Sequence, residues 1–352
     1  MRAAYAPYRL QFIEPGGTSR GVLHYKDTYL LKVWDESNPE IIGIGECALF
    51  KGLSAEDNDQ YENKLLELCQ NIRLGQETEL CDHSSIMFGL ESALNDLASG
   101  GKRIYFPSDF TSGKHKIKIN GLVWMGTKEK MLERIDQKVA AGFHTIKLKI
   151  GAIDFESELS LIRYIRTRYS AMDLEIRVDA NGAFSPDEAP TKLEALSKLG
   201  LHSIEQPIKA GQWEEMAKLC RTTPLPIALD EELIGITNPM VMLSLLRTIQ
   251  PQYIILKPSL CGGFLGATDW LKMAYQLNIG GWITSALESN IGLAAIAQWT
   301  ATLKPLIPQG LGTGMLYSNN FSSPLEQTQD FLWYNCDKAW DINLNNFNWI
   351  EE

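Results

Sequence analysis

The chain has 352 residues, which is long for one domain and leaves room for a barrel of about 250 residues beside a smaller domain. Its 45% hydrophobic and 22% charged residues are ordinary for a globular protein, and its net charge of −10 disfavours nucleic acid or an anionic membrane surface as the main partner. No stretch approaches the roughly 20 apolar residues of a membrane span, and no apolar run follows Met1 as in a signal peptide.

The residues that bind soft metals or form disulfides are dispersed along the chain. The six cysteines form no Cys-x-x-Cys pair, and the five histidines have no ligand spacing to one another. This usage favours a reduced, cytoplasmic enzyme over a disulfide framework or a zinc site.

The predicted elements change character near residue 116. Alternating runs such as GVLHYKDTYLLKVWDE predict antiparallel strands over residues 1 to about 55, and residues 54 to about 100 are typical of helices. Beyond them, apolar strand patterns alternate with amphipathic helix patterns, which predicts a parallel sheet closed into a barrel. The predicted strands are 116–121, 145–150, 175–180, 202–206, 226–230, 253–257 and 281–285, with a weaker one at 309–314.

Five charged residues recur at steps of 25 to 30 residues, each at the end of a short apolar run. They are Lys149, Asp179, Glu205, Asp230 and Lys257. A strand, a helix and two loops take about 30 residues, so the five residues occupy the same position at successive strand ends. Barrels of this kind keep their active sites at the carboxyl ends of the strands. Each residue alone could be an ordinary charge at a loop edge, but five at one register indicate a site.

The three carboxylates predict a metal site. Side chains alternate faces along a strand, so the apolar neighbour of each charge faces the helices while the charge faces the barrel axis. Charges buried there need a compensating partner, and oxygen ligands alone favour Mg²⁺, with Mn²⁺ as a substitute. The alternation turns Glu231 away from the axis, so Asp230 is the preferred ligand at that strand end.

The lysines predict proton transfer. Lys147 and Lys149 share one face of their strand, and repulsion between them would lower the pKa of Lys149. Lys257 should face the cavity from the opposite side. A carboxylate substrate held by metal between the two is suited to removal of a proton α to its carboxylate.

At these residues the chain resembles the enolase superfamily, in its muconate-lactonizing subgroup. The resemblance implies an α/β fold with a modified TIM barrel, (β/α)7β, over residues 115–320. It also implies an α+β capping domain of the enolase type over residues 1–110, joined by the C-terminal tail 321–352. Asp179, Glu205 and Asp230 would bind Mg²⁺, and Lys149 and Lys257 would be the acid–base pair. The motifs are KLK (147–149), VDANG (178–182), IEQP (204–207), LDE (229–231), LKPS (256–259), SALESNIGL (285–293) and GIGECALF (43–50).

Several residues are candidates for contacts with a small carboxylate substrate. Arg20 lies in PGGTSRG, a loop that the resemblance places over the barrel, and its guanidinium suits a carboxylate. Gly312 and Gly314 in GLGTGMLYSNN could offer backbone N–H groups to an anion, although they equally fit a turn. Asn181 and Ser285 are candidates for direct or supporting contacts. An apolar rim suited to a ring is predicted at Leu122, Trp124 and Met125, where packing is the alternative role.

The subgroup carries several reactions. GLGTGMLYSNN (310–320) resembles the segment of synthases that dehydrate 2-succinyl-6-hydroxy-2,4-cyclohexadiene-1-carboxylate to o-succinylbenzoate, a step of menaquinone biosynthesis, and the apolar rim suits the ring of that substrate. The resemblance therefore implies this dehydration. Racemisation of N-acylamino acids or epimerisation of dipeptides is the alternative, although the Asp-x-Asp of dipeptide epimerases is absent at 310–320. A non-catalytic barrel is a third alternative. The oligomeric state stays open.

Overall fold

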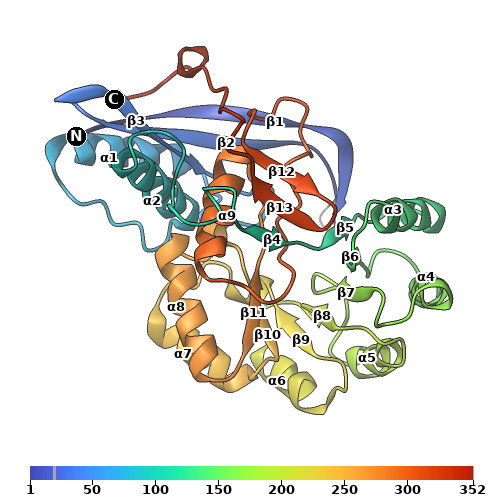
Figure 1. Cartoon of the computed structure of the whole chain (residues 1–352). Helices are drawn as coiled ribbons and strands as arrows, with labels where there is room; N and C mark the ends of the chain where they lie inside the picture. Colours follow the sequence, from blue (N-terminus) through green and yellow to red (C-terminus); the bar gives the residue numbers. More distant parts are fainter. Residues whose placement is uncertain (19–20, 352) are drawn as a thin grey trace.

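The first part of the chain forms an antiparallel sheet covered by two helices. The protein is described here by a computed structural model over residues 1–18 and 21–351. Strands β1 (Arg2–Thr18), β2 (Gly21–Asp35) and β3 (Asn38–Cys47) lie in that order in the sheet. Helices α1 (Tyr61–Leu74) and α2 (Ser84–Ala98) pack beneath it (Figure 1). This agrees with the strands and helices predicted for residues 1–100.

Glycines allow the close contact between this sheet and α2. A Cβ atom on Gly45 of β3 would lie 1.9 Å from the carbonyl oxygen of Gly89 in α2. No side chain fits at that distance, and the same holds for Gly43, which explains the two glycines of the IIGIGE segment. The approach brings the next residue, Glu46, into a fully buried position.

The second part is a curved parallel sheet. Its described strands follow the order β11-β10-β9-β8-β7-β6-β5, and isolated bridges of Gln309 with Ile119 and of Gly310 with Thr284 join its two edges. The weak strand predicted at 309–314 is therefore a short closing segment of the barrel. The strands are β5 (Gly121–Val123), β6 (Thr145–Lys149), β7 (Glu175–Asp179), β8 (Ser203–Glu205), β9 (Ile227–Leu229), β10 (Tyr253–Leu256) and β11 (Gly280–Ile283).

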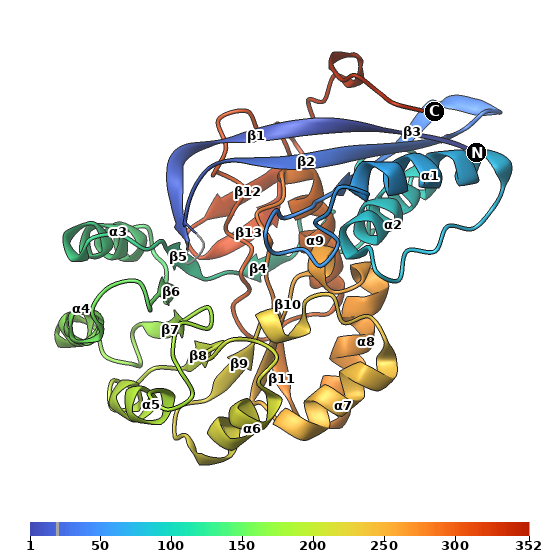
Figure 2. The ribbon, with the colours of Figure 1, turned by 180° about the vertical axis from the view of Figure 1, so that it is seen from behind.

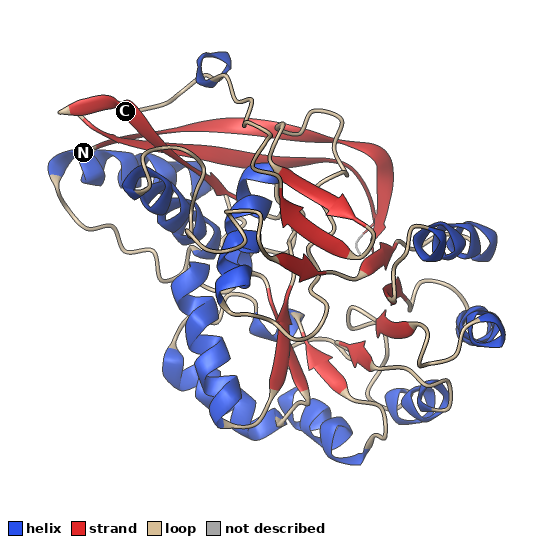
Figure 3. Ribbon diagram, viewed as in Figure 1, coloured by secondary structure: helices blue, strands red, loops and turns tan. Residues whose placement is uncertain are grey.

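Helices alternate with these strands and lie outside them (Figure 3). Side-chain caps fix several of their starts: Asp154 accepts hydrogen bonds from the backbone of α4, and Ser289 does so for α9. The helices are α3 (Lys128–Ala140), α4 (Phe155–Arg168), α5 (Ala189–Ser197), α6 (Trp213–Thr222), α7 (Pro239–Ile249), α8 (Gly263–Gln276) and α9 (Asn290–Thr302). None of the described helices is long and apolar enough to cross a membrane.

The prediction of one strand over 116–121 was wrong. Strand β4 (Lys116–Lys118) pairs with β13 (Phe331–Tyr334), which pairs with β12 (Leu325–Thr328) in a small antiparallel sheet. The barrel begins only at Gly121. The partner of β4, strand β13, lies more than 200 residues further along the chain. No local pattern could therefore reveal that the strand predicted over 116–121 is split in two.

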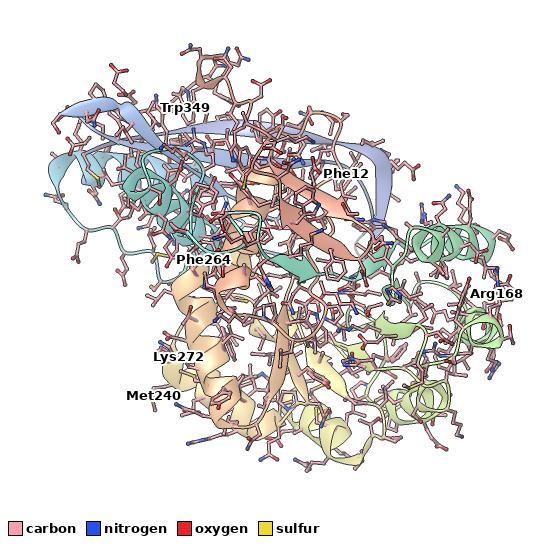
Figure 4. All side chains as sticks on the ribbon, viewed as in Figure 1. Phe12, Arg168, Met240, Phe264, Lys272 and Trp349 are labelled. Carbon is pink, nitrogen blue, oxygen red and sulfur yellow. The ribbon has the colours of Figure 1, made fainter. Side chains whose placement is uncertain are left out.

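The last described residues return to the first sheet. Ile350 pairs with Tyr5 of β1, and both chain ends lie at the same end of that sheet (Figures 1 and 2). Trp349 lies beside the sheet, far from Met240 and Lys272 on the barrel helices (Figure 4). The division into a capping domain with the tail 321–352 and a barrel domain stays a prediction.

Candidate active site

Three of the five predicted charges stand in one row across neighbouring strands. In the register of β6, β7 and β8, Lys149 lies opposite Asp179, and Asp179 lies opposite Glu205. Residues opposite each other in a parallel pair point to the same face. Asp230 directly follows β9 and Lys257 directly follows β10, so both extend the row along the same edge.

Each lysine contacts a carboxylate. Lys147 Nζ lies 2.8 Å from Asp179 Oδ2 and 2.6 Å from Glu205 Oε2. Lys149 Nζ lies 2.5 Å from Asp179 Oδ2, and Lys257 Nζ lies 2.5 Å from Asp230 Oδ2. The structure therefore brings together the six residues predicted as metal ligands or acid–base groups.

Two carboxylate oxygens of this row are left without a partner. Glu205 Oε1 and Asp230 Oδ1 are buried and have no hydrogen-bond partner. Burial raises the pKa of Glu205 well above its usual value, and the charges of Asp179 and Asp230 add to that effect. An extra cation at these oxygens would relieve both penalties, and carboxylate oxygens are the ligands that hard divalent cations prefer.

Lys147 occupies the place between two of the carboxylates. Within the described ranges, no three His, Cys, Asp or Glu side chains stand in a ready arrangement for a metal ion. Instead the Lys147 ammonium bridges Asp179 and Glu205. The three carboxylates have the right chemistry for a metal, and the Lys147 ammonium occupies the place between two of them.

The lysine pKa values follow from the same contacts. Burial by itself would lower the pKa of Lys147, but the carboxylates of Asp179, Glu205 and Asp230 outweigh burial and raise it. The pKa of Lys257 is raised in the same way, against burial, chiefly by Asp230 and Glu231. Both lysines are thus held as ammonium groups.

A cavity of about 120 Å³ opens above this row. Of the predicted contacts, Asn181, Ser285 and Gly312 line it together with the three lysines. Asn181 adopts the left-handed backbone conformation (φ 45°), which Asn tolerates, and its Oδ1 accepts a hydrogen bond of 2.8 Å from Lys149 Nζ. The remaining lining residues are Leu23, Phe50, Lys51, Leu53, Asn120, Leu122, Trp124, Glu231, Thr284, Ala286, Leu287, Gly310 and Thr313.

Two predicted contacts, Gly314 and Met125, do not line this cavity. Gly314 lines a neighbouring cavity, where a Cβ atom would come within 3.0 Å of Asn290 Oδ1. Met125 does not line the main cavity, unlike Leu122 and Trp124. Arg20 lies outside the described residues.

The expected direction of Glu231 was wrong. Its side chain lines the cavity, and Asn181 Nδ2 donates a hydrogen bond of 2.9 Å to its Oε1. Strand β9 already ends at Leu229, and a 3₁₀ turn begins at Glu231 (Glu231–Leu233). Alternation of side chains holds only inside a strand, so it did not apply to this position.

Gln206 is a supporting residue that the sequence argument missed. Its Oε1 accepts hydrogen bonds from the backbone N–H of Asp230 (3.1 Å) and Glu232 (3.3 Å), and its Nε2 donates to Ile208 O and Glu232 Oε2. It thereby ties the end of β8 to the end of β9, where Glu205 and Asp230 stand. The IEQP motif was visible, but nothing in the sequence separates a structural Gln from a surface one.

The capping sheet also contributes to the site. Leu23 of β2 lines the cavity, as do Phe50 and Leu53 from the segment after β3. Glu46 accepts hydrogen bonds from the backbone N–H and hydroxyl of Ser289 and from the N–H of Gly292, at the start of α9. The first sheet thus both covers the cavity and holds one of its walls.

Comparisons with known proteins agree with this architecture. Residues 130–330 match the family model described as Enolase C-terminal domain-like. An o-succinylbenzoate synthase of Desulfotalea psychrophila is 47% identical over 92% of this chain and 96% of its own. The crystal structure of MenC from the same organism has a TM-score of 0.84 at 42% identity, covering 95% of this chain and 99% of that one.

A more distant relative performs another reaction of the same scaffold. The L-Ala-D/L-Glu epimerase of Bacillus subtilis is 27% identical over 58% of this chain and 52% of its own. The chain belongs to the enolase superfamily, with the barrel and capping sheet that the sequence resemblance implied. Within it, the similarity to the synthase is much greater than the similarity to the epimerase.

Proposed function

We propose that the protein is an o-succinylbenzoate synthase, a hydro-lyase that dehydrates 2-succinyl-6-hydroxy-2,4-cyclohexadiene-1-carboxylate to o-succinylbenzoate in menaquinone biosynthesis. The observation that carries this proposal is 47% identity to such a synthase along nearly the whole of both chains. The site supports it, because Lys149 and Lys257, each in contact with a carboxylate, line a cavity with an apolar side.

Asp179, Glu205 and Asp230 are the proposed ligands of Mg²⁺, for which Mn²⁺ can substitute. The unpartnered oxygens of Glu205 and Asp230 support this assignment. The bound metal would stabilise the negative charge that develops on the substrate carboxylate. The free cysteines, four of them buried, support a reducing, cytoplasmic location.

Lys149 is the proposed base and acid. Its amine takes the proton α to the substrate carboxylate, which leaves an enediolate, and returns a proton to the departing hydroxyl group. The C–O bond then breaks, water leaves, and the ring becomes aromatic. Asn181 Oδ1, 2.8 Å from Lys149 Nζ, orients the amine.

Lys257 is the proposed electrostatic partner. Its raised pKa keeps an ammonium opposite Lys149, where it would stabilise the enediolate. Lys147 sets the charge balance of the carboxylates. Ser285, Gly312, Gly314 and Arg20 remain proposed substrate contacts, with Gly314 the least direct, since it lines the neighbouring cavity.

The test is conversion of the synthetic cyclohexadiene acid, followed by absorbance with Mg²⁺ and with EDTA. Rapid aromatisation that EDTA abolishes supports the synthase. Absence of turnover in enzyme shown to bind Mg²⁺ would refute it. Exchange of solvent deuterium into an N-succinyl amino acid or a dipeptide would then identify the racemase or epimerase alternative.

A further inference from the structure

One wall of the cavity is held in an unfavourable backbone conformation. Leu287 follows β11 in the segment between Ser285 and Ser289 and has a φ of 62°. Left-handed backbone is uncommon outside Gly, Asn and Asp, and for a bulky residue it is a true exception. Such residues persist where their surroundings fix them, and they concentrate at binding sites.

Hydrogen bonds on both sides of Leu287 hold the conformation. Its N–H donates to Ser285 Oγ at 3.0 Å, and its carbonyl accepts from the Tyr317 hydroxyl at 2.7 Å. The preceding N–H, of Ala286, donates to Glu288 Oε2 at 2.7 Å. Glu288 in turn accepts from Ser259 Oγ at 2.6 Å, two residues after Lys257. The segment is thus tied to the strand end that carries the second lysine.

The side chain that this conformation presents belongs to the apolar side of the cavity. Leu287 lines the cavity and keeps 8% of its surface exposed. It packs in one apolar cluster with Leu23, Phe50 and Trp124, which line the same cavity. The lysines and Asn181 form the polar side. A ligand with a charged end and a hydrocarbon ring matches this division.

We propose that Leu287 is a specificity-determining residue, whose strained backbone presents an apolar wall to the ring of the substrate. This rests on the proposed synthase function, because that substrate supplies the ring. Substitution of Leu287 by Gly or Asn would lower the strain of the left-handed backbone and would remove the apolar wall. The presence of Leu at this strained position, with its side chain on the cavity wall, supports a role for that side chain.

The test compares Leu287→Asn and Leu287→Gly with the unaltered enzyme. Asn is close to Leu in size and tolerates left-handed backbone, and Gly adopts it without strain, so both variants should fold and bind Mg²⁺. We expect KM for the cyclohexadiene acid and Kd for o-succinylbenzoate to rise about tenfold, with a smaller change in kcat. The matched control is Leu306→Asn, at a leucine that is 99% exposed, which should leave both constants unchanged.

The outcomes separate the two proposals. If the unaltered enzyme turns over the acid and both Leu287 variants keep KM and Kd within twofold, the role of Leu287 is refuted and the synthase stands. A fall in kcat and in Mg²⁺ affinity with unchanged Kd for the product also refutes it, because that pattern marks a purely structural residue. If the unaltered enzyme lacks turnover, the synthase proposal fails, and the Kd comparison alone decides the role of Leu287. Failure of the unaltered enzyme to bind o-succinylbenzoate would refute both.

Discussion

Lys147 is the residue on which the charge balance of the site depends. Its ammonium contacts Asp179 and Glu205, while a second lysine, Lys149, contacts the same oxygen of Asp179. Burial opposes ionisation of Asp179, but these two lysines keep its pKa below the usual value. The two lysines thus hold Asp179 ionised, in the form that a metal requires.

Removal of the proposed base should separate catalysis from metal binding. We expect Lys149→Ala to lower kcat by about 10²- to 10⁴-fold, the usual contribution of a positioned acid–base group. Binding of Mg²⁺, measured by calorimetry, should persist because the three carboxylates remain. Lys198→Ala, at an exposed surface pair with Glu194, is the control. A rate close to that of the unaltered enzyme would show that the proton moves through another group.

His202 should contribute to the loss of stability in acid. The ring lies 5.1 Å from that of Tyr253 and 6.2 Å from that of Trp282, between centroids, and burial lowers its pKa from 6.5. A group with a lowered pKa binds its proton more readily in the unfolded chain, so its stabilising effect is present above pH 6.5 and lost as the pH falls.

The corresponding measurement is the melting temperature between pH 7.5 and about pH 5. We expect His202→Gln to show a shallower decrease in this range than the unaltered protein. His115→Gln, at an exposed position, should retain the full decrease. An unchanged slope in the His202 variant would contradict the assignment.

At the scale of elements, the side chain of Gln206 adds to the backbone pairing of β8 and β9 and ties the end of β8 to the turn after β9. Gln206 bonds the backbone on both sides of Glu231, and it is fully buried. Its own backbone is left-handed, with φ of 38°. We infer that Gln206 helps to position Asp230 relative to Glu205 through the backbone N–H groups of Asp230 and Glu232.

We expect Gln206→Met to weaken both the fold and the metal site. Methionine matches the shape but leaves the N–H groups of Asp230 and Glu232 unpaired, at about 1–3 kcal/mol for each. Chemical denaturation should show that loss, and calorimetry should show weaker Mg²⁺ binding. Gln212→Met provides the control, since that amide makes one exposed hydrogen bond to Lys209 O. Equal effects in the two variants would refute the positioning role.

The same scale explains what the sequence could predict. The sequence could predict five residues of the site because their spacing matches the repeating unit of a barrel. They are Lys149, Asp179, Glu205, Asp230 and Lys257. The prediction gave the wrong direction for the Glu231 side chain and joined two strands into one over 116–121. Both errors arise because the exact residue where a strand ends depends on tertiary pairing. The cavity wall from Leu23 and Phe50 arises from residues more than 60 positions before the barrel, which no local pattern reports.

At the scale of the molecule, metal binding should stabilise the fold. A ligand that binds only the folded state at a hundredfold excess over its Kd adds about 2.7 kcal/mol. We expect Mg²⁺ to raise the melting temperature, and Asp230→Asn to remove most of that rise. Glu175→Gln, at the opposite end of β7 and paired with Arg177, should keep it. An equal rise in all three proteins would show that Mg²⁺ acts elsewhere.

The bridge between Tyr5 and Ile350 joins residues separated by almost the whole chain. During synthesis, β1 emerges long before Tyr317 and Ile350, which pair with its outer edge, and a bare strand edge invites pairing with other chains. Until Ile350 arrives, the part of this edge at Tyr5 is therefore exposed to aggregation. We expect truncation before residue 340 to give protein that is made but largely insoluble, with solubility restored when the missing segment is supplied as a separate peptide.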